Sequence, residues 1–150
     1  MRPKTERFGI LEEVAKVSRK IRTLFDARVR AKGLTLARAR TLLRIARCEA
    51  SNQKALAEEL EIETATLVRI IDGLEAQGLI QRKEVQGDRR AKQVVLTKEG
   101  LRLSELVDEL AQQIEGEVLA GIDKPDLRAA LGTLRRMVSN TDALASRFGG

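Results

Sequence analysis

Two apolar helical patterns separated by only three residues constrain the fold of this chain more than any other feature. Residues 53–60 and 64–77 have the apolar spacing of short helices, and residues 61–63 alone connect them. Two helices joined by so short a turn form a helix-turn-helix. Ser51 or Asn52 can cap the first of them. The small core between the helices is predicted to contain Leu56, Ala57, Leu60, Ile62, Leu67, Ile70, Ile71 and Leu74.

A β-hairpin is predicted directly after the helix-turn-helix. Residues 79–85 (LIQRKEV) and 93–97 (QVVLT) favour two short strands, because both contain β-branched and aliphatic residues and the first of them follows Gly78. The stretch GDRRAKQVVLT, residues 87–97, supplies the tip and the return strand. A helix-turn-helix followed by a hairpin is a winged helix, which we place over residues 34–97.

Long helices are predicted on both sides of the winged helix. Residues 8–32 carry one apolar stripe, and residues 98–147 contain two more, separated near Asp123. Thr35 and Thr97 are expected to cap the helices that follow them. These stripes exceed what a small winged helix can cover, so residues 8–32 and 98–147 are predicted to form a twofold dimer interface. The expected fold is mainly α with a small β-wing, in a single domain of residues 1–150.

The charge distribution points to a negatively charged partner. The net charge is +6, but residues 1–50 carry 14 basic and 5 acidic side chains, whereas the remainder is slightly acidic. A basic first third fits a polyanion, although an arginine-rich surface without a partner has the same composition. The chain has no Trp or Tyr and three Phe, so stacking on single-stranded nucleic acid is poorly supported.

Several classes of function lack the residues they need. The chain has no His and a single cysteine, Cys48, which excludes an intramolecular disulfide and argues against a Cys/His metal site. No Gly-rich phosphate loop or catalytic constellation stands out, so we expect neither an enzyme nor a cofactor. No signal peptide or membrane span is evident, and the lone thiol suits a cytoplasmic protein. Cys48 itself is interpreted as a packing residue, with redox sensing as the alternative.

The recognition helix and hairpin together resemble those of MarR-type transcriptional regulators, particularly the SlyA-like branch. The resemblance rests on Asp72–x–Leu74–Glu75–x–x–Gly78–Leu79, on Asp88–x–Arg90 and on Leu96–Thr97–x–x–Gly100. It covers about residues 8–147 and implies a winged-helix homodimer that binds pseudo-palindromic duplex DNA. Many members of that family release DNA when they bind a small aromatic acid, a phenol or a related metabolite. Glu61 departs from the glycine that often occupies this turn.

Candidate DNA-binding residues lie on the second helix of the helix-turn-helix and on the hairpin. Thr64 and Thr66 can donate to phosphates, and Arg69 can bridge guanine O6 and N7. The alternative is a capping threonine and a solvated arginine. On the hairpin, Arg89 or Arg90 can enter a narrow minor groove, Asp88 can orient a neighbouring guanidinium, and Lys92 can meet phosphate. A solvated charged turn is the alternative there.

The helix over residues 36–47 is crowded with arginines. Like charges at these spacings repel, so a partner is expected: phosphate, a ligand carboxylate, or Glu49 and the acidic helix after residue 98. The resemblance implies an effector pocket near this helix. The candidate effector-binding residues are Arg38, Ala39, Arg40 and Arg44.

The residues and the resemblance together predict a sequence-specific, double-stranded-DNA-binding regulator. We expect a repressor that an aromatic carboxylate, a phenol or an acyl-CoA thioester releases. A ligand-independent architectural or anti-silencing DNA-binding protein of the same fold is the alternative. A protein-binding winged helix that has abandoned DNA is disfavoured by Arg69, Arg89 and Arg90.

Overall fold

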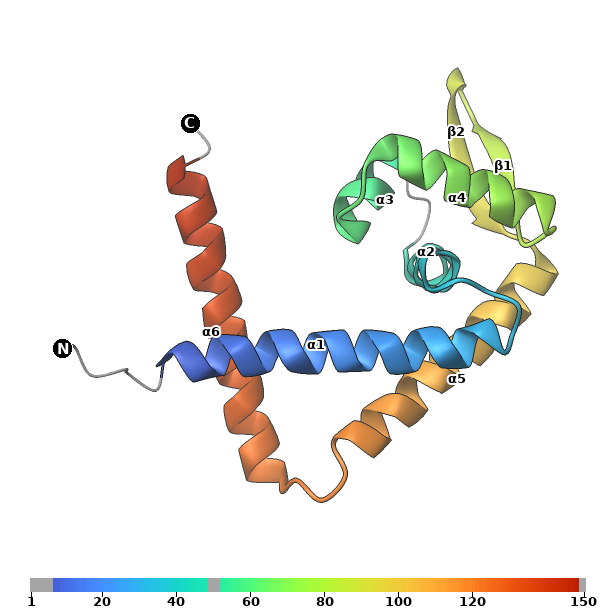
Figure 1. The fold of residues 1–150 in the computed structure, drawn as a ribbon. Helices are drawn as coiled ribbons and strands as arrows, with labels where there is room; N and C mark the ends of the chain where they lie inside the picture. Colours follow the sequence, from blue (N-terminus) through green and yellow to red (C-terminus); the bar gives the residue numbers. More distant parts are fainter. Residues whose placement is uncertain (1–6, 49–51, 149–150) are drawn as a thin grey trace. The chain divides into compact units, whose positions relative to one another are not determined.

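The structure is a computed structural model that describes residues 7–48 and 52–148, with the side chains of residues 7, 8 and 89–91 outside the description (Figure 1). Eight elements follow one another along the chain. They are α1 (Arg7–Arg30), α2 (Leu36–Arg47), α3 (Gln53–Leu60), α4 (Thr64–Ala76), β1 (Ile80–Val85), β2 (Asp88–Leu96), α5 (Lys98–Val118) and α6 (Lys124–Phe148). The predicted mainly helical fold with a two-stranded antiparallel wing is confirmed.

Three helices begin at the capping residues that the sequence predicts. Thr35 Oγ1 accepts from the backbone N–H of Arg38 at 3.2 Å, and Asn52 Oδ1 accepts from that of Ala55 at 2.8 Å. Thr97 Oγ1 likewise accepts from the backbone N–H of Gly100 at 3.0 Å. Each bond satisfies an amide that the first turn of a helix leaves without a partner, and this places the helix start. Ser51, the other candidate cap, lies outside the described residues.

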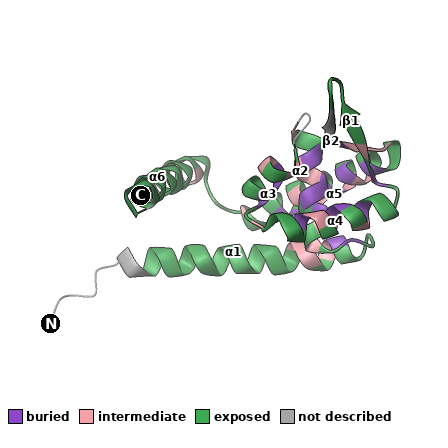
Figure 2. Cartoon of the chain, turned by 90° about the horizontal axis from the view of Figure 1, so that it is seen from above, coloured by how far each residue is buried: buried purple, intermediate pink, exposed green. Residues whose placement is uncertain are grey.

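The core of the winged helix draws side chains from every surrounding element. Leu42 of α2, Leu56 of α3, and Leu67 and Ile71 of α4 are fully buried, and Val107 of α5 packs into the same cluster. The eight predicted core residues are all buried or partly buried, with Ile62 and Ile70 at the margin. Figure 2 shows this buried set in the winged helix and along α5, whereas most of α1 is exposed.

Glycine allows the base of the wing to sit close against α5. A side chain at Gly100 would put its Cβ 1.8 Å from the backbone oxygen of Leu79. The Thr97 hydroxyl also donates to the backbone oxygen of Gly78 at 2.6 Å. The Leu96–Thr97–x–x–Gly100 motif thus fastens the end of the hairpin to the start of α5.

The hairpin differs from the expected one in where its second strand begins. The sequence predicts a strand over 93–97, but β2 begins at Asp88 and only Gln86 and Gly87 form the turn. Gly87 adopts φ 91°, a conformation that glycine allows at little cost and that makes a two-residue turn possible. The tip predicted for the stretch from Asp88 to Lys92 is therefore wrong, and these residues belong to a strand.

Glu61 holds the turn between α3 and α4 in a left-handed conformation, with φ 55° and ψ 40°. It is the one residue other than glycine with positive φ among the described residues. This conformation crowds Cβ against the following carbonyl and costs roughly 1–2 kcal/mol. The departure from glycine at this turn therefore carries a conformational cost in the native structure.

Replacing Glu61 with glycine is expected to stabilise the protein by about 1 kcal/mol, because glycine adopts this conformation without strain. The greater freedom of glycine in the unfolded chain offsets part of the strain that is relieved. Urea unfolding measures the difference. Glu58→Gly, inside α3, is the matched control and should destabilise by roughly 0.5–1 kcal/mol. Equal losses for both variants would contradict the strain at Glu61.

The chain divides into two compact units, Met1–Glu115 and Gly116–Gly150. In the first, α1 exposes large apolar side chains, including Leu11 and Val17, which are 60% and 47% exposed. In the second, α6 has no buried residue over Lys124–Phe148, and Leu131 and Val138 are exposed. Within the part of the chain that the structure describes, no helix is long and apolar enough to cross a membrane.

Candidate nucleic-acid interface

One face of α4 is buried and the opposite face is polar and exposed. Leu67 and Ile71 are fully buried, and Arg69 stands two residues from each of them. Two residues span about 200° of an α-helix, so Arg69 points away from the core. Thr64 and Thr66 are exposed as well. The structure therefore gathers the three predicted residues in the N-terminal half of α4.

The N-terminus of α4 has no side-chain cap. Glu63 occupies the capping position, but its side chain makes no capping hydrogen bond. The first backbone bond within the helix runs from the Leu67 N–H to the Glu63 oxygen at 3.0 Å. Amides of a first turn that lacks a side-chain cap favour phosphate, and the positive end of the helix dipole adds to this preference.

Arg82 joins the wing to α4. From β1 its Nη2 lies 2.5 Å from Asp72 Oδ1, and its Nη1 lies 2.9 Å from Glu75 Oε1. The hydrogen bond with Asp72 is the main cause of the raised pKa of Arg82. One partly buried guanidinium thereby holds two carboxylates that lie one turn apart. Sequence reasoning missed this role, because the contact depends on how β1 packs against α4.

Replacing Arg82 with methionine is expected to destabilise the protein by about 1 kcal/mol, a value that allows for the exposure of both carboxylates. Asp72→Asn should have less effect in the methionine background than in the wild type, because the partner is already gone. Urea unfolding of the four proteins in this double-mutant cycle measures the coupling. Strictly additive losses would show that the ion pair contributes nothing.

The predicted wing residues lie along β2. Lys92 is exposed and pairs in register with Glu84 of β1, while Asp88 lies opposite Val85 beside the turn. The backbones of Arg89 and Arg90 continue the same strand. The side chains of these two arginines lie outside the description, so their assignment to a groove stays a prediction.

The candidate effector residues of α2 have different neighbours in the part of the chain that the structure describes. Ala39 is fully buried in the core. Arg44 Nε is hydrogen-bonded to Glu59 Oε2 of α3, and this bond lowers the pKa of Glu59. Arg38 and Arg40 instead turn toward α4. Arg38 Nη1 donates to Gln77 Oε1 at 3.1 Å, and Arg40 lines a small hollow of about 100 Å³ that Thr66 also lines.

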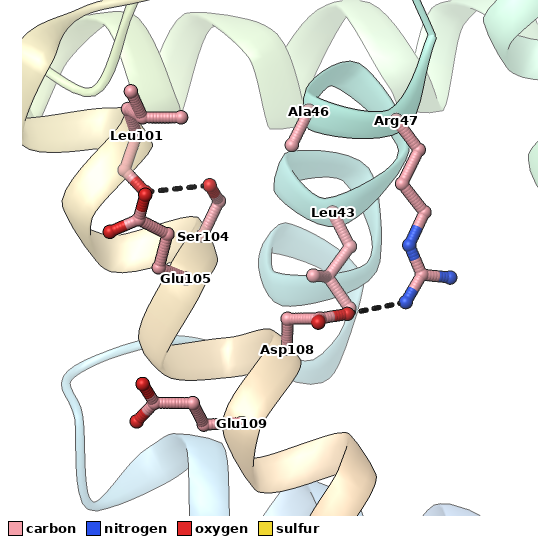
Figure 3. Close-up of a pocket in the computed structure, with 8 residues that line it drawn as sticks. All are labelled: Leu43, Ala46, Arg47, Leu101, Ser104, Glu105, Asp108 and Glu109. Carbon is pink, nitrogen blue, oxygen red and sulfur yellow. Dashed lines mark hydrogen bonds and ion pairs between the residues drawn. The ribbon is translucent and has the colours of Figure 1, made fainter.

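An open groove of about 410 Å³ lies between α2 and α5 (Figure 3). Its lining consists of Leu43, Ala46, Arg47, Leu101, Ser104, Glu105, Asp108 and Glu109. Arg47 Nη2 lies 2.5 Å from Asp108 Oδ1, so for Arg47 the structure shows one of the expected alternatives, a partner on the acidic helix. Hydrogen bonds from Arg47 and then from Gln112 lower the pKa of Asp108. The sequence did not reveal the groove, because its two sides are about sixty residues apart.

Cys48 ends α2 as a partly buried residue. Its Sγ lies 3.7 Å from Glu59 Oε2, the oxygen that Arg44 also contacts. Glu49, another expected partner of the α2 arginines, lies outside the described residues.

Comparison with known proteins bears on this arrangement of α4 and the wing. Residues 32–91, which contain α2, α3, α4 and the turn of the wing, match the model of the MarR family. The structure of the transcriptional regulator PA3341 is 37% identical to the chain, with a TM-score of 0.81. The alignment covers 91% of the present chain and 98% of that chain. The chain belongs to the MarR family. As a MarR-family member it is a DNA-binding transcriptional regulator, not an enzyme.

More distant structures share this MarR fold. The transcriptional regulator SlyA is 23% identical, with a TM-score of 0.79 and coverage of 88% of this chain and 93% of that one. A MarR family regulator from Listeria monocytogenes, complexed with 26mer DNA, is 22% identical with a TM-score of 0.79. That alignment covers 93% of the present chain and 95% of the Listeria chain. At these identities the comparison establishes the fold alone.

Proposed function

We propose that this MarR-family protein is a homodimeric repressor that binds double-stranded DNA in a sequence-specific manner. It places α4 in the major groove of the DNA and the wing against the minor groove. The exposed face of α4 that bears Thr64, Thr66 and Arg69 is the observation that carries the proposal. A recognition helix reads base edges with residues near its N-terminus, where these three residues lie. The Listeria regulator of the same fold is complexed with 26mer DNA, which supports DNA binding by the present protein.

The proposed roles follow from the chemistry of each side chain. Thr64 and Thr66 donate to phosphates beside the N-terminus of α4, and Arg69 contacts guanine O6 and N7 with its planar fork. On the wing, Arg89 or Arg90 enters the minor groove, where negative potential is concentrated. Asp88 orients the adjacent guanidinium. Lys92, exposed on β2, adds a phosphate contact.

The homodimer is proposed because two separate sets of apolar side chains are uncovered. In α1 the exposed set is Ile10, Leu11, Val14, Val17, Ile21 and Leu24, and in α6 it includes Leu131, Leu134, Val138 and Leu144. A second copy, joined over residues 8–32 and 98–147 around a twofold axis, would cover both sets. Such a dimer would present two recognition helices about one turn of DNA, roughly 34 Å, apart.

Replacing Arg69 with alanine is expected to cost about 1–3 kcal/mol on a specific site and to relax the preference at particular base pairs. Competition binding against single-base variants of the site measures this. Arg69→Lys is the matched control, since it keeps the charge but loses the planar fork. The lysine variant should retain non-specific affinity and lose base preference. Wild-type discrimination in both variants would contradict base contact by Arg69.

Release by a small effector forms the second part of the proposal. The groove between α2 and α5 supports it, because it is open and lies between the recognition domain and a proposed dimerisation helix. Three carboxylates line this groove, and its single arginine is already paired with Asp108. Of the effectors expected from the sequence, the lining therefore suits phenols better than aromatic carboxylates or acyl-CoA thioesters, and it also suits cationic ligands.

A ligand of the groove is expected to raise the melting temperature and to weaken DNA binding by roughly 5–150-fold, a typical range of allosteric coupling. A screen should contain phenols, aromatic amines, aromatic carboxylates and acyl-CoA thioesters. Ala46→Phe is a suitable control variant, because Ala46 is exposed and phenylalanine would fill the groove without altering the core. Failure of every compound to shift melting or release DNA would favour a ligand-independent architectural role.

A further inference from the structure

The exposed side of α4 has a gap at Gly73, and a side chain from α2 fills this gap. Thr66, Arg69, Gly73 and Gln77 follow one another at spacings that place them along the same side of the helix. Gly73 contributes no side chain there, although glycine is a poor helix former. A Cβ at Gly73 would lie 2.3 Å from Arg38 Nη2 and 2.8 Å from Arg38 Cζ. The Arg38 guanidinium therefore occupies the space that a side chain at position 73 would take.

Two contacts hold the Arg38 guanidinium in this gap, which we call the notch at Gly73. Neither contact compensates its positive charge. Arg38 Nη1 donates to Gln77 Oε1 at 3.1 Å, and the glycine backbone lies against the guanidinium. The glutamine amide is neutral. Arg44 and Arg82, by contrast, each have carboxylate partners within the winged helix. Among the ion pairs of the described residues, none involves Arg38.

We propose that Arg38 is a phosphate-binding residue, which α2 presents through the notch at Gly73 beside Arg69. The inference rests on the proposed DNA-binding mode of α4 and adds a contact from a different helix. It replaces the effector role that the sequence suggested for Arg38. Arg40 extends the same edge, because it lines the hollow beside Thr66 at the other end of α4.

The geometry suits phosphate better than a base edge. The guanidinium lies on the flank of α4, one turn beyond Arg69, where the sugar–phosphate backbone borders a helix seated in the major groove. A fixed guanidinium offers paired N–H donors to phosphate oxygens and has already lost much of its conformational freedom. Such a contact strengthens binding to all sequences and depends on salt, because it displaces counterions.

Arg38→Gln tests the proposal directly. Fluorescence anisotropy on a specific duplex and on a scrambled duplex, over a series of salt concentrations, should show a loss of about tenfold on both. The slope of log K against log salt should fall by about one. Arg44→Gln, on the same helix but paired with Glu59, is the control and should leave the slope unchanged.

Gly73→Ala provides an independent variant that keeps every charge. The added methyl group should displace the Arg38 guanidinium from the notch, whereas the better helix propensity of alanine maintains the melting temperature. DNA affinity should fall by a factor similar to that of Arg38→Gln. The double variant should lose no more than either single variant, because both changes remove the same contact.

An Arg38→Gln protein that folds and dimerises, with the wild-type salt slope, would overturn the proposal and leave Arg38 as a packing contact. The same holds if Gly73→Ala binds DNA like the wild type. If the wild type binds DNA and depends on Arg69, such results reject the Arg38 contact alone. If the wild type does not bind DNA, both proposals fail together.

Discussion

Val138→Asp is expected to convert the protein into a monomer and to lower its affinity for a specific DNA site by about 2–5 kcal/mol. Val138 is 61% exposed on α6, so its own unit should tolerate the change. At a twofold interface, however, each dimer would bury two new carboxylates without partners, which is costly. The expected loss is about half of the roughly 4–10 kcal/mol that separates specific from non-specific binding, because a monomer reads one half-site.

Sedimentation at micromolar concentration and DNA titration together measure the effect of Val138→Asp. Ser139→Asp, the next residue along α6, introduces the same charge about 100° around the helix and serves as the control. The control should remain dimeric. A wild-type protein that sediments as a folded monomer would refute the proposed interface, as would a Val138→Asp variant that stays dimeric.

The double change of Arg89 and Arg90 to alanine should have the second large effect. If either arginine enters the minor groove, affinity should fall most on sites with A·T-rich flanks, where the groove is narrow. The salt slope should fall by up to about two, one for each lost contact with the charged backbone. Titrations on paired sites with A·T-rich and G·C-rich flanks measure both quantities.

Lys92→Ala is the matched comparison on the same strand. Lys92 is exposed on β2, and its loss should weaken binding to all flanks alike. A double arginine variant that folds, dimerises and keeps both operator affinity and salt slope would show that the wing is an ordinary charged hairpin. A loss independent of the flanks would place both arginines on phosphates rather than in the groove.

Local signals predicted much of this fold. The caps at Thr35, Asn52 and Thr97 act within one helical turn, so a short stretch of sequence is enough to recognise them. Apolar spacing likewise predicted the buried face of α4. The start of β2 was predicted five residues late, because the polar run from Asp88 to Lys92 does not resemble a strand. Its pairing with β1 and the turn at Gly87 determine that conformation.

The candidate DNA-binding site was harder to predict where segments that are distant in the sequence meet in the fold. Arg69 could be placed on the exposed face of α4 from periodicity alone. The position of Arg38 beside Gly73, and of Arg82 between Asp72 and Glu75, depends on tertiary packing. Clustering of arginines on α2 predicted that they have partners but left open whether these are phosphate, a ligand carboxylate or acidic residues of the chain. In the structure Arg44 turns to α3, Arg47 to α5 and Arg38 to α4. A helix that packs against several others distributes its charged side chains among them.

Selection of duplexes from a random-sequence pool by the wild-type protein tests the central claim most directly. The proposed function predicts enrichment of a pseudo-palindrome whose half-sites lie about one helical turn apart. Binding of the enriched duplex should exceed that of a scrambled duplex by on the order of 10³-fold or more, at the same salt concentration. A pool that remains random although it binds would indicate an architectural protein, and a pool from which nothing is retained would contradict DNA binding by α4 and the wing.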